Sequence, residues 1–167
     1  MIHCNLIVHN IRSCYNVGSL FRTADGLGVE KLYLTGYTPY PLQPNDYRLP
    51  FMAQKTDRQI HKTALGAELE VDWERVEDIF NLITKLKNQK YQIVGLEQAP
   101  NSVPLNSFQP HGKVALIIGR EIGGIDPSIL SLTDTVIEIP MFGKKDSFNV
   151  AQATAIALYH IKTLDIK

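Results

Sequence analysis

The sequence predicts an α/β fold, with a mainly parallel sheet flanked by helices. Short runs of apolar, largely β-branched residues recur along the chain, and each is nearly continuous, as expected of strands covered on both faces. Helical patterns lie between these runs, and strands that alternate with helices form a parallel sheet. The predicted strands are Leu6–Val8, Leu32–Thr35, Tyr91–Leu96, Val114–Ile118 and Val136–Ile139.

The first helix is predicted from Asn16 to Leu27, with Asn16 placed as its N-cap and two glycines near its end. Its apolar residues recur at the 3.6-residue spacing of a helix face. Gly18, Arg22 and Asp25 then lie on the opposite side. Arg22 is expected one turn into the helix, near the strand ends.

The stretch Gly36–Asp57 contains four prolines and three tyrosines, so we expect neither a regular helix nor a central strand there. A loop of this length is usually functional or mobile. Its tyrosines, beside Arg48, Lys55 and Arg58, are suited to stacking on bases and binding phosphates. Packing of the tyrosines against the domain is an equal alternative.

Two helices are predicted in the second half of the chain. An amphipathic stripe covers Ile79–Leu86, and the last helix runs from about Asn149 to Ile166. The turn before this last helix contains Ser147, for which a simple N-cap is the plainest role.

The 167 residues (18.8 kDa) fit a single domain over 1–167, and we expect no appended RNA-binding domain. No apolar run reaches the ~18 residues of a membrane span, and the start does not resemble a signal peptide. Cys4 and Cys14 lack metal-type spacing and do not make a disulfide scaffold. A cytoplasmic protein is therefore expected. The five histidines form no ligand-like cluster, so no metal is expected.

Net charge is zero, but the charges are unevenly distributed. Residues 1–62 hold seven Lys/Arg and four Asp/Glu, a balance of +3, whereas residues 63–100 hold four and seven, a balance of −3. A basic first third suits a polyanion, with the acidic middle facing away. Alternatively, the basic and the acidic segments are both simply solvent-exposed surfaces of the protein.

Three polar segments each follow a predicted strand and precede a predicted helix, where open α/β proteins bind ligands. The second segment is neither a dinucleotide fingerprint nor a phosphate loop. Its Glu121, directly after an apolar strand, needs hydrogen-bond partners, and bracing the loop through backbone N–H groups is one way to gain them. We therefore predict one composite site from Asn16–Ala24, Gly119–Gly124 and Ser147–Val150.

Together these segments resemble the three motifs of the SpoU-type (SPOUT class) RNA ribose 2′-O-methyltransferases. The family's motifs are Asn-x-Gly with Arg-Thr-Ala, Gly-x-Glu-x-x-Gly, and Ile-Pro followed by Ser-Leu-Asn-Val. The likeness covers about residues 5–165, including a typical stretch at Lys62–Glu68. Two positions depart from the pattern, since Arg120 replaces a common Asn and Phe148 a common Leu. The matching residues are Asn16, Gly18, Arg22–Ala24, Gly119, Glu121, Gly124, Ile139, Pro140 and Ser147–Val150.

The resemblance implies a C-terminal trefoil knot with loops at about Leu96–Pro100, Gly119–Gly124 and Ile139–Asn149, and a homodimer formed through the first and last helices. It also implies S-adenosylmethionine as cofactor. The implied catalytic residues are Arg22, Asn16, Glu121, Ser147 and Asn149. The implied cofactor-binding residues are Leu96, Gly119, Ile139, Ser147 and Phe148. The expected RNA contacts are Arg12, Arg22, Arg48 and Lys144.

By the same resemblance, Arg22 acts on the ribose hydroxyl. Because guanidinium is not deprotonated in ordinary protein sites, we expect Arg22 to clamp a phosphate and stabilise the developing oxyanion. A phosphate or a water then takes the proton. Two alternatives are a non-catalytic RNA-binding module that keeps the fold and a generic nucleotide-binding α/β domain. The target is open, with tRNA slightly favoured over rRNA.

Overall fold

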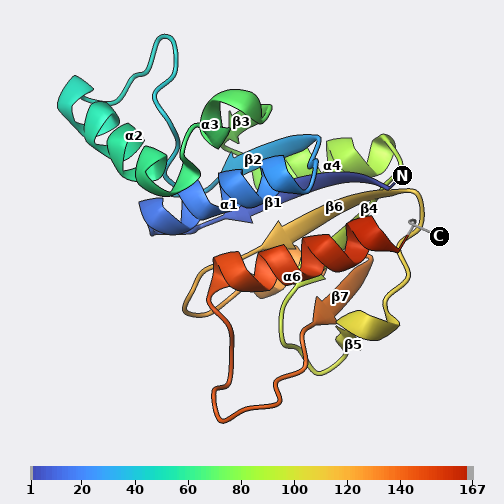
Figure 1. Cartoon of the computed structure of the whole chain (residues 1–167). Coiled ribbons are helices and arrows are strands. Elements are labelled where there is room, and N and C mark those ends of the chain that lie inside the picture. The colour runs from blue at the N-terminus through green and yellow to red at the C-terminus, as the bar shows by residue number, and fades with distance from the viewer. Residues whose placement is uncertain (1, 165–167) are drawn as a thin grey trace.

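The computed structural model describes residues 2–164 and contains one sheet of seven strands, in the order β3-β2-β1-β6-β4-β7-β5 (Figure 1). Every pair of neighbouring strands is parallel, so the predicted fold class is confirmed. The strands are β1 (His3–His9), β2 (Lys31–Thr35), β3 (Trp73–Val76), β4 (Tyr91–Leu96), β5 (Val103–Pro104), β6 (Lys113–Ile118) and β7 (Thr135–Glu138).

Helices cover both faces of the sheet (Figure 1). On one face α1 and α6 pack on the strands, with α2 beside α1, and on the other face lie α4 and α5. The helices are α1 (Cys14–Gly26), α2 (Pro50–Ala64), α3 (Ala67–Glu70), α4 (Ile79–Asn88), the 3₁₀-helix η1 (Leu105–Ser107), α5 (Pro127–Leu130) and α6 (Val150–Thr163).

The central strands β1, β6 and β4 are buried from both sides, which explains their continuous apolar sequences. All five predicted strands are present. The sequence patterns did not reveal β3 and β5, because the first lies in an acidic stretch and the second has only two residues.

The prediction that no regular helix forms in Gly36–Asp57 is wrong from residue 50 onward. Pro50 is the first residue of α2, a position that tolerates proline because its N–H has no helical partner. Of the loop tyrosines, Tyr40 is buried against Trp73, as the packing alternative expected, whereas Tyr37 and Tyr47 are exposed.

The start of α1 also corrects two expectations. The N-cap is Ser13, whose side chain accepts from the Asn16 backbone N–H, so Asn16 lies in the first turn with its side chain free for other contacts. Gly18 is buried against α2 and does not share the exposed side of Arg22: a Cβ at Gly18 would lie 2.2 Å from the Ile60 carbonyl oxygen.

The last helix begins with Asn149 as its N-cap, which accepts from the backbone N–H of Ala151 at 2.9 Å. An N-cap role for Ser147 is therefore wrong. The end of the predicted helix, Asp165 and Ile166, lies outside the described residues. The trefoil knot stays a prediction. Among residues 2–164, no helix combines the length and apolar character that a membrane span requires.

Candidate functional site

A cavity of about 570 Å³ opens at the carboxyl ends of β4, β6 and β7. Because β4 pairs with both β6 and β7, the loops that follow these strands meet at one edge of the sheet. We call this the large cavity. It is lined by Leu96–Gln98, Ile118–Glu121, Gly123, Gly124, Ile139, Met141, Ser147–Val150 and Ala153.

The large cavity contains most of the predicted site residues. All five predicted cofactor-binding residues line it, together with Glu121 and Asn149. Backbone and apolar side chains form much of its wall, with Leu96, Ile139 and Phe148 among them. Such a wall suits a partly apolar ligand group held by a few polar contacts.

A chain of side-chain hydrogen bonds joins the three sequence segments beside this cavity. The Asn149 amide donates to Asn16 Oδ1 at 3.2 Å, and the Asn16 amide donates to Glu121 Oε1 at 3.0 Å. The backbone N–H of Arg12 adds a longer contact, 3.4 Å, to Glu121 Oε2. Residues separated by up to 133 positions are thus in direct contact, and Glu121 braces the start of α1 as well as its own loop.

Hydrogen bonds keep the Glu121 carboxylate ionised. Partial burial alone raises the pKa of Glu121, but its own backbone N–H, the Asn16 amide and the N–H groups of Arg12 and Ser13 outweigh this effect and lower the pKa below its ordinary value. At neutral pH the carboxylate therefore accepts hydrogen bonds and cannot donate one.

The second segment forms a tight turn that is closed by a hydrogen bond from Arg120 N–H to the Gly124 carbonyl, 3.1 Å. Gly123 and Gly124 have φ of +90° and +60°, which side-chain-bearing residues rarely adopt. A Cβ at Gly119 would lie 2.5 Å from the Gly124 backbone. The turn therefore requires glycine where its two ends meet.

Glu97 is a cavity residue that the sequence patterns did not single out. Its Oε2 accepts from the backbone N–H of Ile125 at 2.9 Å, and its carboxylate occupies the space that a Cβ at Gly124 would fill. The sequence did contain a signal for it, because Glu97 directly follows the strand Tyr91–Leu96. Glu121 was identified by the same rule, that polar residues just after parallel strands lie at the ligand-binding edge of the sheet.

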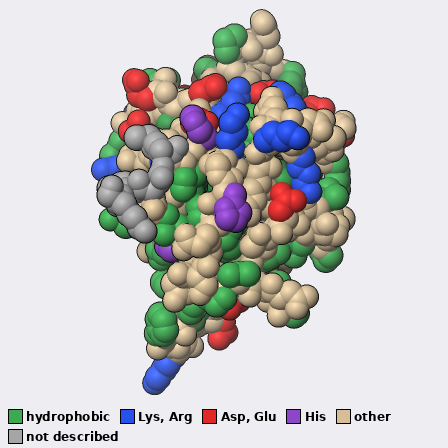
Figure 2. Space-filling view, turned by 90° about the vertical axis from the view of Figure 1, so that its right-hand side faces the viewer, with side chains coloured by type: hydrophobic (Ala, Val, Ile, Leu, Met, Phe, Trp, Pro, Cys, Tyr) green, Lys and Arg blue, Asp and Glu red, His purple; other side chains and the backbone are tan. Residues whose placement is uncertain are grey.

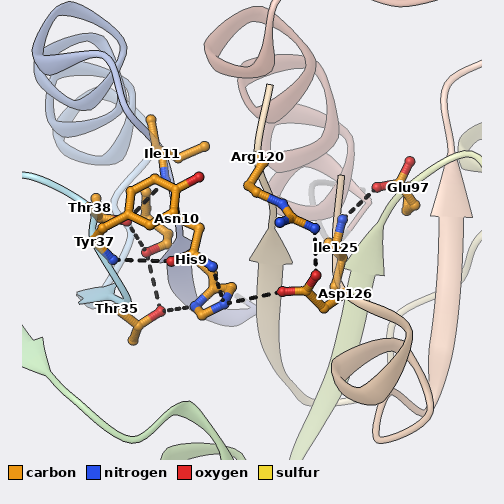
Figure 3. Close-up of polar contacts among 11 residues, drawn as sticks. His9, Asn10, Ile11, Thr35, Tyr37, Thr38, Glu97, Arg120, Ile125 and Asp126 are labelled. Carbon is orange, nitrogen blue, oxygen red and sulfur yellow. Dashed lines mark hydrogen bonds and ion pairs between the residues drawn. The ribbon is translucent and has the colours of Figure 1, made fainter. Parts of the chain in front are cut away.

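Arg120, the departure from the family pattern, is part of a polar network at the strand ends (Figure 3). It donates to Asp126, whose other oxygen lies 3.9 Å from Nε2 of buried His9. The pKa of His9 is lowered, mainly because burial disfavours the charged ring. The positive charges of Arg120 and Arg75 lower this pKa further, and the negative charge of Asp126 raises it. Asn10 donates to His9 Nε2, so at neutral pH the ring is neutral with Nδ1 donating to Thr35. The bond from Arg120 to Asp126 therefore stabilises the second segment itself, while the bonds of His9 join β1 to β2.

The third loop, between β7 and α6, projects from the molecule with Lys/Arg and Asp/Glu side chains near its tip (Figure 2). Residues 142–149 are exposed, and Phe142 is 98% exposed. The base of the loop is tied to the cavity by a hydrogen bond of 2.8 Å from the Gln98 amide to the Asp146 carbonyl. Lys144 and Ser147 thus sit on a segment that is open to a large partner.

Arg22 is not among the residues of the large cavity. It lies eight residues into α1, about 12 Å along the helix axis from Cys14. There it lines a second, more open cavity of about 440 Å³. The lining residues of this second cavity are Ser19, Arg22, Thr23, Lys62, Thr63 and Leu65.

The two other arginines predicted to contact RNA differ in how free their side chains are to bind it. Arg12 has an exposed side chain at the start of α1. Arg48 is held by its own loop: its guanidinium pairs with Asp46, donates to the Tyr40 and Pro41 carbonyls, and stacks 3.7 Å from the centre of the Tyr40 ring. Four of its five guanidinium N–H groups are thus used within the loop, so the geometry favours a structural role for Arg48 over an RNA contact.

Within residues 2–164, no group of three or more His, Cys, Asp and Glu side chains is placed to hold a metal ion. Both cysteines are free thiols.

The parallel sheet, covered by helices on both faces, places the chain in the α/β class, in which the carboxyl edge of the strands is the usual ligand site. The chain belongs to the SpoU rRNA Methylase family, whose pattern it matches over residues 3–159. The family resemblance seen in the three motifs is thereby confirmed.

Individual relatives agree with this assignment. The tRNA (guanosine(18)-2'-O)-methyltransferase of Aquifex aeolicus is 29% identical over 150 residues, 90% of this chain and 64% of that protein. The 23S rRNA (guanosine(2553)-2'-O)-methyltransferase RlmP of Bacillus subtilis is 26% identical over 157 residues, 94% of this chain and 57% of that protein. This chain thus spans about three fifths of these curated relatives.

Among solved structures, the SpoU methyltransferase AviRb from Streptomyces viridochromogenes, in complex with the cofactor AdoMet, has the same fold. Its TM-score is 0.79 at 22% identity, covering 99% of this chain and 58% of AviRb.

Proposed function

We propose that this chain is an S-adenosylmethionine-dependent RNA methyltransferase that modifies a ribose 2′-hydroxyl. The observation that carries the proposal is the hydrogen-bonded chain Asn149–Asn16–Glu121 beside the large cavity. It joins all three motifs of the family to which the chain belongs. Two relatives of the chain are named as 2'-O-methyltransferases, one of tRNA and one of rRNA.

The large cavity fits the proposed cofactor. Its volume of about 570 Å³ is that of a small-molecule site. Side chains are excluded at Gly119 and Gly124, which lets the backbone approach a ligand closely. Leu96, Gly119, Ile139, Ser147 and Phe148 would hold the cofactor there. When bound, S-adenosylmethionine supplies an electrophilic methyl group.

The chain's own residues contribute orientation and charge. Asn149 fixes the start of α6 and orients Asn16, and ionised Glu121 fixes the other end of Asn16. Ser147, exposed at the cavity wall, is free to bind cofactor or ribose. Holding both reactants in line supplies much of the rate.

Arg22 belongs with the RNA contacts, because it lies outside the large cavity and no carboxylate of residues 2–164 pairs with it. In this proposal it clamps a phosphate next to the reacting ribose and stabilises the developing oxyanion, while a phosphate oxygen or a water takes the proton. Arg12 and Lys144 add exposed positive charge near the large cavity.

We further propose a homodimer formed through α1 and α6, with tRNA ahead of rRNA as substrate. Exposed apolar side chains on these helices, Tyr15, Ile156 and Tyr159, support the dimer. The relative with 29% identity is named for tRNA and the one with 26% for rRNA, which gives tRNA a small preference. Sedimentation velocity tests the dimer directly.

One assay tests the activity. The protein is incubated with methyl-labelled S-adenosylmethionine and either bulk tRNA or bulk rRNA, and the product is analysed for 2′-O-methylated nucleosides. Labelled 2′-O-methyl ribose is the expected product. RNA binding without methylation in either pool would instead identify a binding module that has kept the fold.

A further inference from the structure

One face of α2 carries a stripe of exposed side chains. Phe51, Lys55, Arg58 and Lys62 are spaced at i, i+4, i+7 and i+11, so they share one side of the helix, and all four are exposed. Asp57 is the one acidic residue of α2, and its carboxylate faces the neighbouring loop, where it accepts from the Leu42 backbone N–H at 2.8 Å. The stripe therefore presents three cations and no carboxylate.

The stripe leads into the second cavity, which combines two cations with three hydroxyl groups. Arg22 and Lys62 supply the charge, and Ser19, Thr23 and Thr63 the hydroxyls. In the part of the chain that the structure describes, no carboxylate lies within ion-pair distance of Arg22 or Lys62. Two like charges at one cavity without a counter-charge favour an anionic ligand.

Close packing of α1 on α2 fixes this arrangement. Gly18 lets the two helices approach until a Cβ there would overlap the Ile60 carbonyl oxygen, and the Thr63 hydroxyl donates to the Tyr15 carbonyl at 2.8 Å. Arg22 lies one turn beyond Gly18 on α1, which brings it opposite Lys62. The two helices that carry these cations are thus held together before any ligand binds.

We propose that the α2 stripe and the second cavity form a binding site for the RNA backbone, with Phe51 stacking on an unpaired base. Lys and Arg neutralise phosphates, and an exposed aromatic ring supplies a stacking surface for a base. From Lys55 to Lys62 the helix rises about 10 Å, the length of about three nucleotides in a stacked strand. This inference rests on the proposal that RNA is the substrate, and it extends the RNA contacts from Arg22 along α2 to Phe51.

The test compares single variants with a matched control on the other side of the sheet. Lys55→Ala, Arg58→Ala and Lys62→Ala are measured against Lys85→Ala, an exposed lysine of α4. Affinity for labelled bulk tRNA is recorded over a range of salt concentrations. Each stripe variant is expected to weaken binding and to reduce the salt slope by about one, and the control to do neither. Unchanged slopes in all three stripe variants would overturn the proposal.

Phe51 has its own matched control in Phe80, which is also exposed, at the start of α4. Phe51→Ala should weaken tRNA binding at least about fivefold, and Phe80→Ala should leave it unchanged. If the two substitutions change tRNA affinity equally, Phe51 does not stack on a base and this part of the proposal is wrong.

Calorimetry with S-adenosylhomocysteine tests the large cavity alone. If the wild-type protein does not bind S-adenosylhomocysteine, the proposed function is contradicted. The RNA-binding measurements on the stripe variants can still be interpreted, because they do not depend on the cofactor.

NMR and sedimentation distinguish an RNA site from a small-anion site and from a contact between copies of the chain. NMR amide shifts of Ser19, Thr23 and Thr63 are followed with bulk tRNA and with inorganic phosphate, and shifts with tRNA are expected. Shifts with phosphate but not with tRNA would mark a small-anion site. A changed sedimentation coefficient of Lys62→Ala without weaker tRNA binding would mark a contact between copies. Either of these last two results overturns the proposal.

Discussion

The large cavity and the second cavity are built in opposite ways. Loops from three strand ends form the first, and side-chain hydrogen bonds between residues far apart in sequence hold these loops together. Two helices in close contact form the second, which is lined by cations and hydroxyls. The first motif is divided between them, because Asn16 contacts the loops whereas Arg22, six residues later, faces α2. The helix α1 therefore links the proposed cofactor site, through Asn16, to the proposed RNA contacts, through Arg22.

The largest expected effect separates the cavities by function. Arg22→Ala should cut turnover on bulk tRNA by roughly 10²-fold or more, the scale of losing one charge-stabilising donor. Affinity for S-adenosylhomocysteine should stay near that of the wild type, because Arg22 does not line the large cavity. Methyl incorporation and calorimetry measure the two quantities. Wild-type turnover in this variant would mean that the large cavity suffices for the reaction.

A pair of glycine substitutions sharpens the same contrast. Gly119→Ala places a Cβ 2.5 Å from the Gly124 backbone and should weaken S-adenosylhomocysteine binding about tenfold, since overpacking of this kind costs about 1–3 kcal/mol. Gly18→Ala places a Cβ 2.2 Å from the Ile60 carbonyl oxygen and should lower the free energy of unfolding by a similar amount while weakening tRNA binding.

Each glycine variant is the control for the other. Calorimetry with S-adenosylhomocysteine, tRNA binding and chemical denaturation are measured on both proteins. Loss of cofactor binding in Gly18→Ala to the same extent as in Gly119→Ala would show that the two cavities are not separable.

The loop that precedes α2 tests which arginines contact RNA. Hydrogen bonds from Arg48 lower the pKa of Asp46 to about 2, so this pair stabilises the fold fully above the ordinary aspartate pKa, and the stabilisation is lost as pH falls through about 2. Arg48→Ala should reduce the free energy of unfolding by about 1–3 kcal/mol at neutral pH, since these hydrogen bonds involve charged groups. The difference from the wild type should shrink as the pH falls towards 2.

The matching RNA measurement makes this result specific. The salt slope of tRNA binding should be unchanged in Arg48→Ala, in contrast to Lys62→Ala. A reduced salt slope in Arg48→Ala would show that Arg48 contacts RNA, as expected from the sequence.

Sequence was sufficient for five of the seven strands and for the convergence of the second and third segments. The strands Val114–Ile118 and Tyr91–Leu96 are recognisable as continuous apolar runs, and parallel strands bring the residues after them to one edge. Glu121 follows this rule, and Glu97 follows it as well, although its role was not recognised.

The contacts of α1 and α2 were harder to predict. Pro50 can start a helix as well as break one, and only the residues after it decide. Gly18 and Arg22 share a side in a helical projection, but the partner helix that covers Gly18 and leaves Arg22 open is distant in sequence. Likewise Arg48 is a plain cation in the sequence, and its pairing with Asp46 depends on the path of the loop.

The smallest expected effect concerns the junction between the cavity and α6. Asn149→Ala removes both the N-cap of α6 and the hydrogen bond to Asn16, so it should lower the free energy of unfolding by about 1 kcal/mol and weaken S-adenosylhomocysteine binding. Asn149→Asp keeps an oxygen to cap the helix but cannot donate to Asn16. Denaturation should therefore distinguish the variants, with stability retained in Asn149→Asp, whereas calorimetry should find cofactor binding weakened in both. If Asn149→Asp binds like the wild type, the cap alone matters, and the hydrogen-bonded chain across the three motifs does not contribute to cofactor binding.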